Sequence, residues 1–345
     1  MIKRLIDLES LVRDNIYNLK PYSSARDDYN GSEGIFLDAN ENPFGTLNRY
    51  PDPYQNVLKQ KLAIIKNVDS RQIFIGNGSD EIIDLALRIF CNPGVDKGLC
   101  FTPSYGMYAV SSDINNIELI KLPLTNDFQI DRNSVTPYLS DSNLKVIFIC
   151  SPNNPTGNLI KESDIKYLLD NFSGIVIVDE AYIDFADSDS LINLLHTYNN
   201  LIVSQTFSKA WGIAAARVGV AYSNKLIISL FNKVKPPYNV SQLNQETAIS
   251  ALESYDSFRE NISTILAEKT KMKMELQGCK VVNKVYPSDA NFFLIEVNDA
   301  DNVYKQLKDQ GIIIRNRNNE VENCVRVTIG TQSENEILIK SLKNL

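Results

Sequence analysis

Lys209 is the side chain in this sequence best suited to act as an amine nucleophile. It lies in SQTFSKAWGIAAARVG, directly after an apolar run and beside Ser208, and Arg217 follows in the same segment. Most lysines are exposed and inert. A lysine enclosed by apolar and small residues, however, has a lowered pKa and can act as a nucleophile. The segment therefore allows a reactive amine, and an inert surface lysine is the alternative.

A second group of polar residues ends the apolar run in IVIVDEAYIDF. Asp179, Glu180 and Tyr182 stand there, directly after a predicted buried strand. Acidic residues in this position are as often a solvated strand end as a functional group. Magnesium binding by the acidic pair is a further alternative, but the sequence offers no nucleotide-binding GK[ST] loop to accompany it.

Two turn segments could bind a ligand. In IFIGNGSDEIIDLALRIF, a strand runs into Gly78, and Ser79 and Asp80 open a helix whose first amide groups favour a phosphate. Taken alone, this segment is more often an ordinary glycine turn with Ser79 as the helix cap. SPNNPTGNLI (151–160) is more specific, because a turn does not need two asparagines, one of them Asn154, between two prolines. It follows an apolar strand, at the edge where open α/β sheets bind ligands.

The composition excludes several other chemistries. The chain has 345 residues and a single histidine, His196, so a site with two or three histidine ligands cannot form and no metal site is predicted. A Ser-His-Asp or Cys-His mechanism would have to use His196, which lies in the helical pattern SLINLLHTY away from the other motifs. The net charge of −7 argues against nonspecific nucleic-acid binding.

The sequence also indicates a cytoplasmic protein. Its five cysteines are scattered and mostly lie within apolar stretches, as expected for reduced thiols. The opening MIKRLIDLES is interrupted by Asp7 and Glu9, so we expect it not to serve as a secretory signal. No apolar run approaches the length of a membrane span, and we therefore expect neither a membrane nor nucleic acid as a partner.

The residues with chemical potential follow short apolar strands that alternate with helical patterns. Strands are expected at 73–76, 98–101, 145–150, 174–180, 201–206 and 217–222. This pattern predicts an α/β fold with a mainly parallel sheet and helices on both faces. A long charged helix is expected from Ser254 to about Gly278. After it come NFFLIEV, a helical pattern at 300–310, GIIIR, VRVTIG and a last helix from about Ser333.

We therefore expect the chain to have three parts. A large domain covers about 41–255, and a smaller C-terminal α/β domain covers about 256–345. Residues 1–40 form an N-terminal segment that packs on the small domain or across a subunit interface.

Taken together, the motifs resemble those of the fold type I aminotransferases, which use pyridoxal phosphate. The order NGSDE, PSYGMY, SPNNPTG, DEAY, SK and R is that family's order, and the agreement runs from about residue 20 to residue 330. Within the family the chain is most similar to the histidinol-phosphate aminotransferases. Four further stretches carry this similarity: NLKPYSSAR (18–26), DANENPFG with RYPDP (38–53), KPPYNVSQ (235–242), and GIIIRNR followed by VRVTIG.

The resemblance implies roles around the cofactor ring. Lys209 would form the Schiff base with the cofactor aldehyde and, once released, would move the proton between Cα and C4′. Asp179 would pair with the protonated pyridine nitrogen and keep the ring an electron sink. Tyr182 and Asn154 would hydrogen-bond the phenolate oxygen, and Tyr105 would stack on the ring face.

The resemblance also places the cofactor phosphate at the helix start after Gly78. Its ligands would be the amides of Ser79 and Asp80, the hydroxyls of Thr206 and Ser208, and the charge of Arg217. Tyr50 matches a tyrosine that reaches this phosphate from the neighbouring subunit, so a homodimer is implied. One departure is local: GIAAAR (212–217) has Ala215 where many relatives have a glycine.

For the substrate, Arg326 matches the arginine that clamps an α-carboxylate, a task for which a planar guanidinium is better suited than an amine. Glutamate would meet Arg326 directly. Histidinol phosphate has no carboxylate, so Arg315, assisted by Arg326, would bind its phosphate, unless Arg315 is only a surface charge at a strand end. Tyr22 would line the imidazole pocket, with Asn154 nearby.

The expected reaction is the transfer of an amino group between glutamate and imidazole-acetol phosphate. Two alternatives share the cofactor: a decarboxylase of threonine phosphate and an aromatic amino-acid aminotransferase. A third is a cofactor-binding regulator without catalysis, which the intact Lys209, Asp179 and Arg326 argue against. No proton transfer is assigned to His196.

Overall fold

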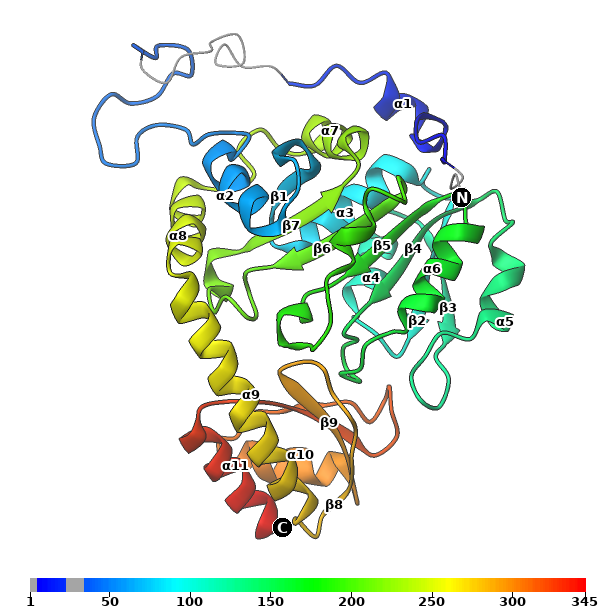
Figure 1. Ribbon diagram of the computed structural model, residues 1–345, viewed down its shortest axis with the longest axis vertical. Coiled ribbons are helices and arrows are strands. Elements are labelled where there is room, and N and C mark those ends of the chain that lie inside the picture. The colour runs from blue at the N-terminus through cyan, green and yellow to red at the C-terminus, as the bar shows by residue number, and fades with distance from the viewer. Residues whose placement is uncertain (1–4, 23–33) are drawn as a thin grey trace.

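A computed structural model of the chain describes residues 5–22 and 34–345 and contains a large and a small β-sheet (Figure 1). The large sheet has seven strands in the order β1-β7-β6-β5-β4-β2-β3. Their bounds are β1 Ile73–Asn77, β2 Lys97–Thr102, β3 Glu118–Pro123, β4 Leu144–Cys150, β5 Ile175–Asp179, β6 Leu201–Thr206 and β7 Val218–Ser223. The predicted α/β fold with a mainly parallel sheet is confirmed. The exception is β7, which runs antiparallel to both β1 and β6.

Helices cover both faces of the large sheet because its strands send alternate apolar side chains to each face. α2 (Asn56–Lys66), α5 (Arg132–Val135), α6 (Glu162–Asn171) and α8 (Gln242–Glu253) belong to the core on one face. α3 (Ser79–Phe90), α4 (Met107–Ile114) and α7 (Lys225–Val234) belong to the core on the other. The central strands β5 and β6 are buried along their whole length, which is why they read as continuous apolar runs.

The beginning of the described chain packs on the large sheet. Leu8, Val12 and Ile16, the last of them in α1 (Asp14–Tyr17), join the core of the face that carries α3 and α7. This part of the N-terminal segment therefore does not pack on the small domain, which was one of its two predicted positions.

The carboxyl ends of the parallel strands meet at one edge of the large sheet. β2, β4, β5 and β6 run in the same direction, so Thr102, Cys150, Asp179 and Thr206 end side by side. The loops that follow these ends carry PSYGMY, SPNNPTG, DEAY and SK. The predicted motifs therefore converge on one edge.

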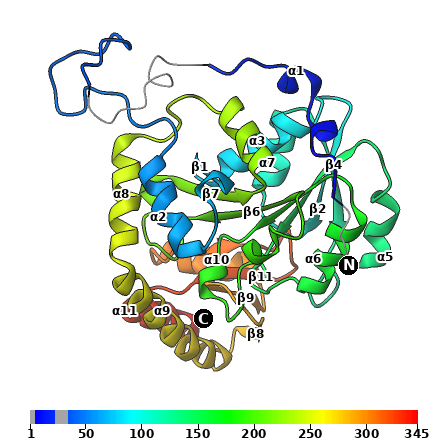
Figure 2. The same cartoon turned by 45° about the horizontal axis from the view of Figure 1, so that its top comes forward.

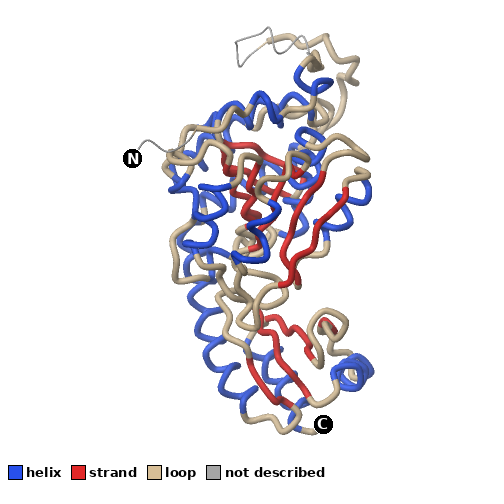
Figure 3. The backbone as a smooth tube through the Cα atoms, turned by 90° about the vertical axis from the view of Figure 1, so that its right-hand side faces the viewer, coloured by secondary structure: helices blue, strands red, loops and turns tan. Residues whose placement is uncertain are grey.

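The small sheet follows α9 (Tyr255–Gln277), which ends at Gly278 as predicted. It is antiparallel in the order β10-β11-β9-β8, with β8 Val282–Val285, β9 Phe292–Val297, β10 Arg315–Asn316 and β11 Cys324–Thr328. α10 (Ala300–Asp309) and α11 (Gln332–Lys343) share its core with α9. Figure 3 shows this unit at the end of the molecule that carries the C-terminus, beyond the large sheet.

Some predicted elements differ from the structure. GIIIR contributes only Arg315 to β10, and SLINLLHTY forms a short 3-10 turn at Leu191–Leu194 instead of an α-helix. β3 was not predicted, because it is an edge strand with mostly exposed or half-exposed residues and lacks a continuous apolar run. The domain boundaries near residues 41 and 255 stay predictions.

The segment before α2 projects away from the large sheet (Figures 1 and 2). It carries large apolar side chains that are open to solvent: Ile35, Leu37 and Phe44 are 91%, 87% and 82% exposed. Across residues 5–22 and 34–345, no helix is both long and apolar enough to cross a membrane.

Candidate active site

Polar side chains gather in a space of about 540 Å³ at the carboxyl edge of the large sheet. Lys209 lies there together with most of the residues predicted to bind the cofactor. The lining residues are Ser79, Asp80, Tyr105, Cys150, Asn154, Asp179, Ala181, Tyr182, Thr206, Ser208, Lys209 and Arg217. Cys150 and Ala181 were not predicted, since a cysteine at a strand end and an alanine in a loop give no chemical signal.

Asp179 is the buried acid of this space and is 4% exposed. Its Oδ1 accepts a hydrogen bond from the backbone N–H of Ala181 over 3.1 Å, and its Oδ2 accepts one from Tyr108 over 3.0 Å. Burial raises the pKa of Asp179 to about 6, and these two hydrogen bonds oppose the rise. A carboxylate in such a position is ready to meet a cationic partner.

Glu180, the neighbour of Asp179, is turned away from the space. Its carboxylate accepts hydrogen bonds from the Ser190 hydroxyl, the Gln205 amide and the Leu191 N–H at 2.5, 2.9 and 2.7 Å. The acidic pair is therefore divided between a site residue and a buried structural residue, which does not suit a shared magnesium ion.

The SPNNPTG loop is buried and is held by Asn153. The Nδ2 of Asn153 donates to the carbonyl oxygen of Pro103 over 2.9 Å and to the Thr156 hydroxyl over 2.7 Å, and its Oδ1 accepts from Ser104 over 2.8 Å. This fixes the loop against the one after β2 and leaves the next residue, Asn154, facing the space. The two asparagines thus have different tasks.

The start of α3 forms a cradle for an anion. Gly78, with a φ of +79°, precedes the helix, and no side chain caps the first turn. A Cβ at Gly78 would lie 2.7 Å from Nη2 of Arg217, and a Cβ at Gly219 would lie 2.4 Å from the Ser79 nitrogen. The two glycines therefore allow β7 and Arg217 to approach the helix amides, whose positive end favours an anion.

Arg217 and Tyr105 both contact Asp80 at this helix start. Arg217 is 3.6 Å from Oδ2 of Asp80, and Tyr105 donates to Oδ1 over 3.0 Å. Arg217 has a φ of +51°, an uncommon value for a residue with a side chain. Arg217 thus lies at the start of α3, where its positive charge adds to that of the helix amides.

The amine of Lys209 lies among groups of both charges. Partial burial and then the charge of Arg326 lower its pKa, whereas Asp179 and Asp80 raise it. Its Nζ is 5.5 Å from the centre of the Tyr182 ring. Tyr182 is 7% exposed, and burial raises the pKa of its phenol, which therefore stays protonated at neutral pH. Lys209 thus has a lowered pKa next to a hydrogen-bond donor.

Arg326 joins the small sheet to this space. Its Nη1 donates to Oδ1 of Asn154 over 2.5 Å, while its Nε is buried without a hydrogen-bond partner in the described part of the chain. Arg315 is exposed and stands directly opposite Arg326 in the β10–β11 pairing. Burial lowers the pKa of Arg326, and the charges of Arg317 and Arg315 lower it further. Arg317 was not predicted, because an arginine in a loop has no distinctive signal.

The predicted residues Tyr22 and Tyr50 lie away from this space. Tyr22 is 70% exposed and lies beside Pro53, Tyr54 and Lys235. Tyr50 stacks on Tyr238 with ring centroids 4.3 Å apart. Within a single chain, neither tyrosine lines the space that contains Lys209.

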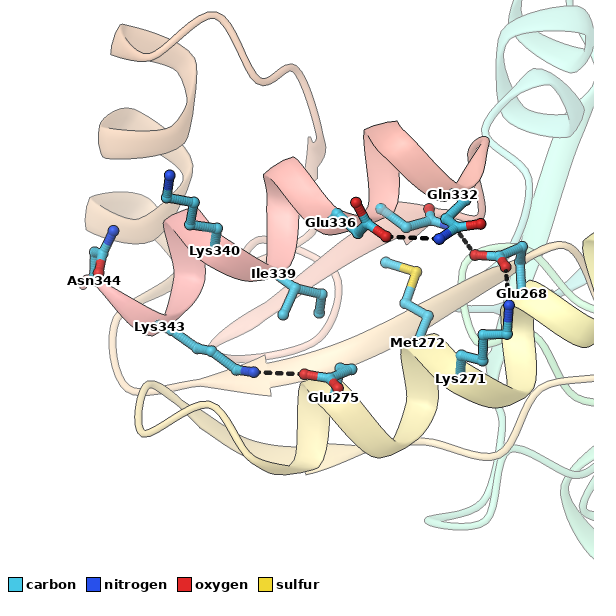
Figure 4. A pocket seen from close by; sticks show the side chains of 11 residues that line it. Glu268, Lys271, Met272, Glu275, Gln332, Glu336, Ile339, Lys340, Lys343 and Asn344 are labelled. Carbon is cyan, nitrogen blue, oxygen red and sulfur yellow. Dashed lines mark hydrogen bonds and ion pairs between the residues drawn. The ribbon is translucent and has the colours of Figure 1, made fainter.

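A larger groove of about 970 Å³ lies between α9 and α11 (Figure 4). Two of its lysines are paired with two of its glutamates: Lys271 binds Glu268 at 2.7 Å, and Lys343 binds Glu275 at 2.5 Å. Gln332 donates to Glu336 over 2.8 Å. Because these groups compensate each other, we assign the chemistry to the edge of the large sheet.

Comparison with known proteins shows the family of this chain. The family model described as aminotransferase class I and II matches residues 29–342. The chain belongs to the class I and II aminotransferases. A relative from Cytophaga hutchinsonii, named histidinol-phosphate aminotransferase, is 50% identical to this aminotransferase over 343 residues, covering 97% of this chain and 98% of the relative. A protein of the same name from Parabacteroides distasonis is 48% identical over 342 residues, covering 98% and 99%.

Solved structures share the fold of this aminotransferase. The crystal structure of the histidinol-phosphate aminotransferase from Clostridium acetobutylicum matches it with a TM-score of 0.79 and 24% sequence identity. The match covers 86% of this chain and 90% of that one. At this identity the likeness concerns the fold.

Pyridoxal phosphate is the cofactor of this aminotransferase family, and the described residues fit it. The Gly78 cradle and the uncapped start of α3 suit its phosphate. The buried carboxylate of Asp179 suits a protonated pyridine nitrogen, and the Lys209 amine suits its aldehyde.

Proposed function

We propose that the chain is a histidinol-phosphate aminotransferase, which transfers an amino group between glutamate and imidazole-acetol phosphate in histidine biosynthesis. The products of this reaction are 2-oxoglutarate and L-histidinol phosphate. The observation that carries the proposal is the pair Arg315 and Arg326, which occupy opposite positions on β10 and β11 beside an aminotransferase site. The names of relatives that are 50% and 48% identical over nearly the whole chain support it.

Lys209 would carry the covalent and proton-transfer steps. When bound, pyridoxal phosphate supplies an aldehyde that accepts the amino group and a ring that stabilises negative charge at the substrate Cα. The lowered pKa of Lys209 makes a neutral amine more available for attack and for removing the Cα proton. His196 is exposed and lies by Lys66 and Asp69, away from Lys209, and would take no part.

The side chains around Lys209 would orient the cofactor. Asp179 would bind the pyridine N–H, and Tyr182 and Asn154 would donate to the phenolate oxygen. Asn154 is suited to this task because its Oδ1 already accepts from Arg326, which leaves the Nδ2 group to donate. Tyr105, anchored to Asp80 by its hydroxyl, would present its ring to the cofactor.

Gly78 and the residues that follow would bind the cofactor phosphate. The amides of Ser79 and Asp80 at the start of α3 would donate to its oxygens. The hydroxyls of Thr206 and Ser208 and the guanidinium of Arg217 line the same space and would complete the set.

The two arginines of the small sheet would select the substrates. Like charges on directly opposite strand positions repel each other, so Arg315 and Arg326 are stabilised when an anion lies between them. The unpartnered Nε of Arg326 can complete a bidentate contact with the α-carboxylate of glutamate. The same pair would hold the phosphate of histidinol phosphate.

The proposal includes a cytoplasmic homodimer. The exposed apolar side chains of Ile35, Leu37 and Phe44 suit burial against a second copy of the chain. Tyr50, on the same segment, would then reach the cofactor phosphate of the partner. Tyr22 would likewise reach the imidazole end of a substrate only in the assembled dimer.

Mixing two defective variants tests this sharing of residues. Lys209→Ala and Tyr50→Ala chains, unfolded and refolded together, should form mixed dimers in which one site has both native residues, and activity should rise above that of either variant alone. A mixture that stays as inactive as its components would contradict a contribution of Tyr50 across the interface.

A substrate screen tests the reaction. The purified enzyme should form glutamate from 2-oxoglutarate when histidinol phosphate is the amino donor. Release of CO₂ from threonine phosphate would instead indicate a decarboxylase, and comparable turnover of phenylalanine would indicate an aromatic aminotransferase.

A further inference from the structure

Tyr108 is a buried tyrosine of the site to which the motifs assign no role. It lies in α4, is 1% exposed, and donates a hydrogen bond to Oδ2 of Asp179 over 3.0 Å. Its ring is stacked on Phe148 of β4, with centroids 4.9 Å apart and ring planes 10° from parallel. Tyr105 packs edge-on against it at 5.7 Å. The hydroxyl is therefore fixed by packing and cannot swing away from Asp179.

We propose that Tyr108 is a positioning residue that keeps the carboxylate of Asp179 ionised and aimed at the ring nitrogen of pyridoxal phosphate. This inference rests on the proposed role of Asp179. It adds a residue of α4 to the groups that control the cofactor.

The physical reason is that Asp179 needs support to stay ionised. Burial disfavours its charged form and raises its pKa to about 6. Burial and the nearby carboxylate raise the pKa of the Tyr108 phenol well above its usual value, so the hydroxyl remains a donor over the whole working pH range. A permanent donor to a buried carboxylate favours the ionised state.

The other groups that face Asp179 do not replace this support. Asp80 from α3 raises the pKa of Asp179 by charge repulsion, and the Cys150 thiol at the end of β4 stays neutral because burial raises its pKa. Lys209 lowers the pKa of Asp179, but its charge changes during the reaction. In the described chain, only Tyr108 and the Ala181 amide donate hydrogen bonds to the carboxylate.

The consequence concerns the proton shared by Asp179 and the pyridine nitrogen. A carboxylate stabilised by Tyr108 is a weaker base, so the proton stays on the ring nitrogen. Without the phenol, Asp179 becomes a stronger base and draws the proton toward itself. The cofactor ring is then a poorer acceptor of negative charge.

The test compares holoenzymes loaded with pyridoxal phosphate that carries ¹⁵N in the ring. In Tyr108→Phe the ¹⁵N resonance should move toward that of an unprotonated pyridine. On dialysis at a series of pH values from 5 to 8, this variant should lose cofactor about tenfold faster, the size expected for one hydrogen bond to a charged group. The midpoint of the loss should lie at higher pH than in the wild type. Tyr222→Phe is the matched control, since Tyr222 is equally buried in β7, on the far side of β6 from β5.

Each outcome decides one claim. A Tyr108→Phe holoenzyme with the ¹⁵N resonance and pH midpoint of Tyr222→Phe would overturn the inference. If that variant does not fold, 3-fluorotyrosine at position 108, a stronger donor of the same shape, should move both readouts in the opposite direction, and unchanged values would overturn it. Asp179→Ala that retains cofactor as well as the wild type would instead overturn the role of Asp179 in the proposed function.

Discussion

Nη1 of Arg326 and Oδ1 of Asn154 are 2.5 Å apart, and this hydrogen bond connects the small sheet directly to the SPNNPTG loop of the large sheet. Asp289 adds two further hydrogen bonds to this loop: its carboxylate accepts from the Leu159 N–H over 2.9 Å, and its backbone N–H donates to the Gly157 carbonyl oxygen over 2.7 Å. Arg326, which we propose to clamp the substrate, is thus held in place by Asn154, which we propose to bind the cofactor.

Arg326→Lys should raise the KM for glutamate, because an ammonium group cannot make the bidentate contact and would not reproduce the bond to Asn154. We expect an increase of about tenfold or more, the size of a lost charged hydrogen bond. Steady-state kinetics on both substrates measure it. Arg259→Lys, an exposed arginine of α9, is the control. An unchanged KM for glutamate would show that Arg326 does not bind the carboxylate.

Lys209→Ala should abolish both cofactor attachment and turnover. Removing the amine takes away the nucleophile and the proton carrier, so the rate should fall by about 10³-fold or more. Borohydride reduction followed by mass spectrometry should find the cofactor on Lys209 in the wild type and on no residue of the variant. Lys305→Ala, an exposed lysine in α10, should keep both properties. Attachment at another lysine would contradict the assignment.

Arg315→Ala should separate the two substrates. The KM for histidinol phosphate should rise by about tenfold or more, since a charged hydrogen bond to the phosphate is lost. The KM for glutamate should change little, because Arg326 still holds its carboxylate. In the same variant, inorganic phosphate should compete less strongly with histidinol phosphate for the site. Equal effects on both substrates, or none on either, would favour the reading of Arg315 as a surface charge.

Asp179 gives a prediction about pH and the stability of the cofactor-free protein. Its pKa of about 6 in the folded chain lies above the ordinary value of 3.8, so the folded state binds its proton more tightly than the unfolded state. The favourable contribution of Asp179 to the free energy of unfolding is therefore complete below pH 3.8 and is lost as the pH rises through 6. An asparagine does not titrate, so Asp179→Asn does not lose this contribution as the pH rises. The free energy of unfolding of the variant minus that of the wild type should therefore increase by up to about 3 kcal/mol from pH 4 to pH 7.

Asp69 provides a control of opposite sign for this experiment. Hydrogen bonds from Arg71 and Lys225 hold the pKa of Asp69 below its usual value. Asp69 therefore stabilises the folded protein above the pKa that it has in the unfolded chain, and this stabilisation is lost as the pH falls through its lower pKa in the folded chain. Asp69→Asn should therefore lose stability relative to the wild type at neutral pH and approach it in acid. Denaturant unfolding at several pH values measures the free energy of unfolding of both variants. If the difference from the wild type changed with pH in the same way for both variants, the prediction would be contradicted.

Gly219→Ala should weaken cofactor binding without a change in any polar group. Its Cβ would lie 2.4 Å from the Ser79 nitrogen and the Gly78 carbonyl carbon, so β7 or the start of α3 must shift. We expect the dissociation constant of pyridoxal phosphate to rise by about tenfold or more, since displaced amides lose charged hydrogen bonds. Gly106→Ala has open space around its Cβ and should bind normally. Equal affinities would show that the cradle tolerates the shift.

Much of the fold could be predicted because the central strands are buried on both faces. IVIVD and LIVSQT are continuous apolar runs for that reason, and both were placed within one or two residues. Edge elements lacked this signal: β3 is partly exposed, and GIIIR forms only the start of the two-residue β10. The antiparallel direction of β7 could not be predicted either, since a buried strand has the same composition in both directions.

The sequence by itself determined which residue types stand at the strand ends and in what order. It therefore indicated the family, and it singled out Lys209, Asp179 and Asn154 as candidates for the chemistry. Only the tertiary structure decided how the neighbours of these residues divide their tasks. It turned Glu180 into the core, placed Arg315 opposite Arg326, and brought Tyr108 to Asp179 across 71 positions of sequence. The reason is physical: local sequence sets the side chains and the strand pattern, whereas contacts between distant segments depend on how the strands pair and which face each helix covers.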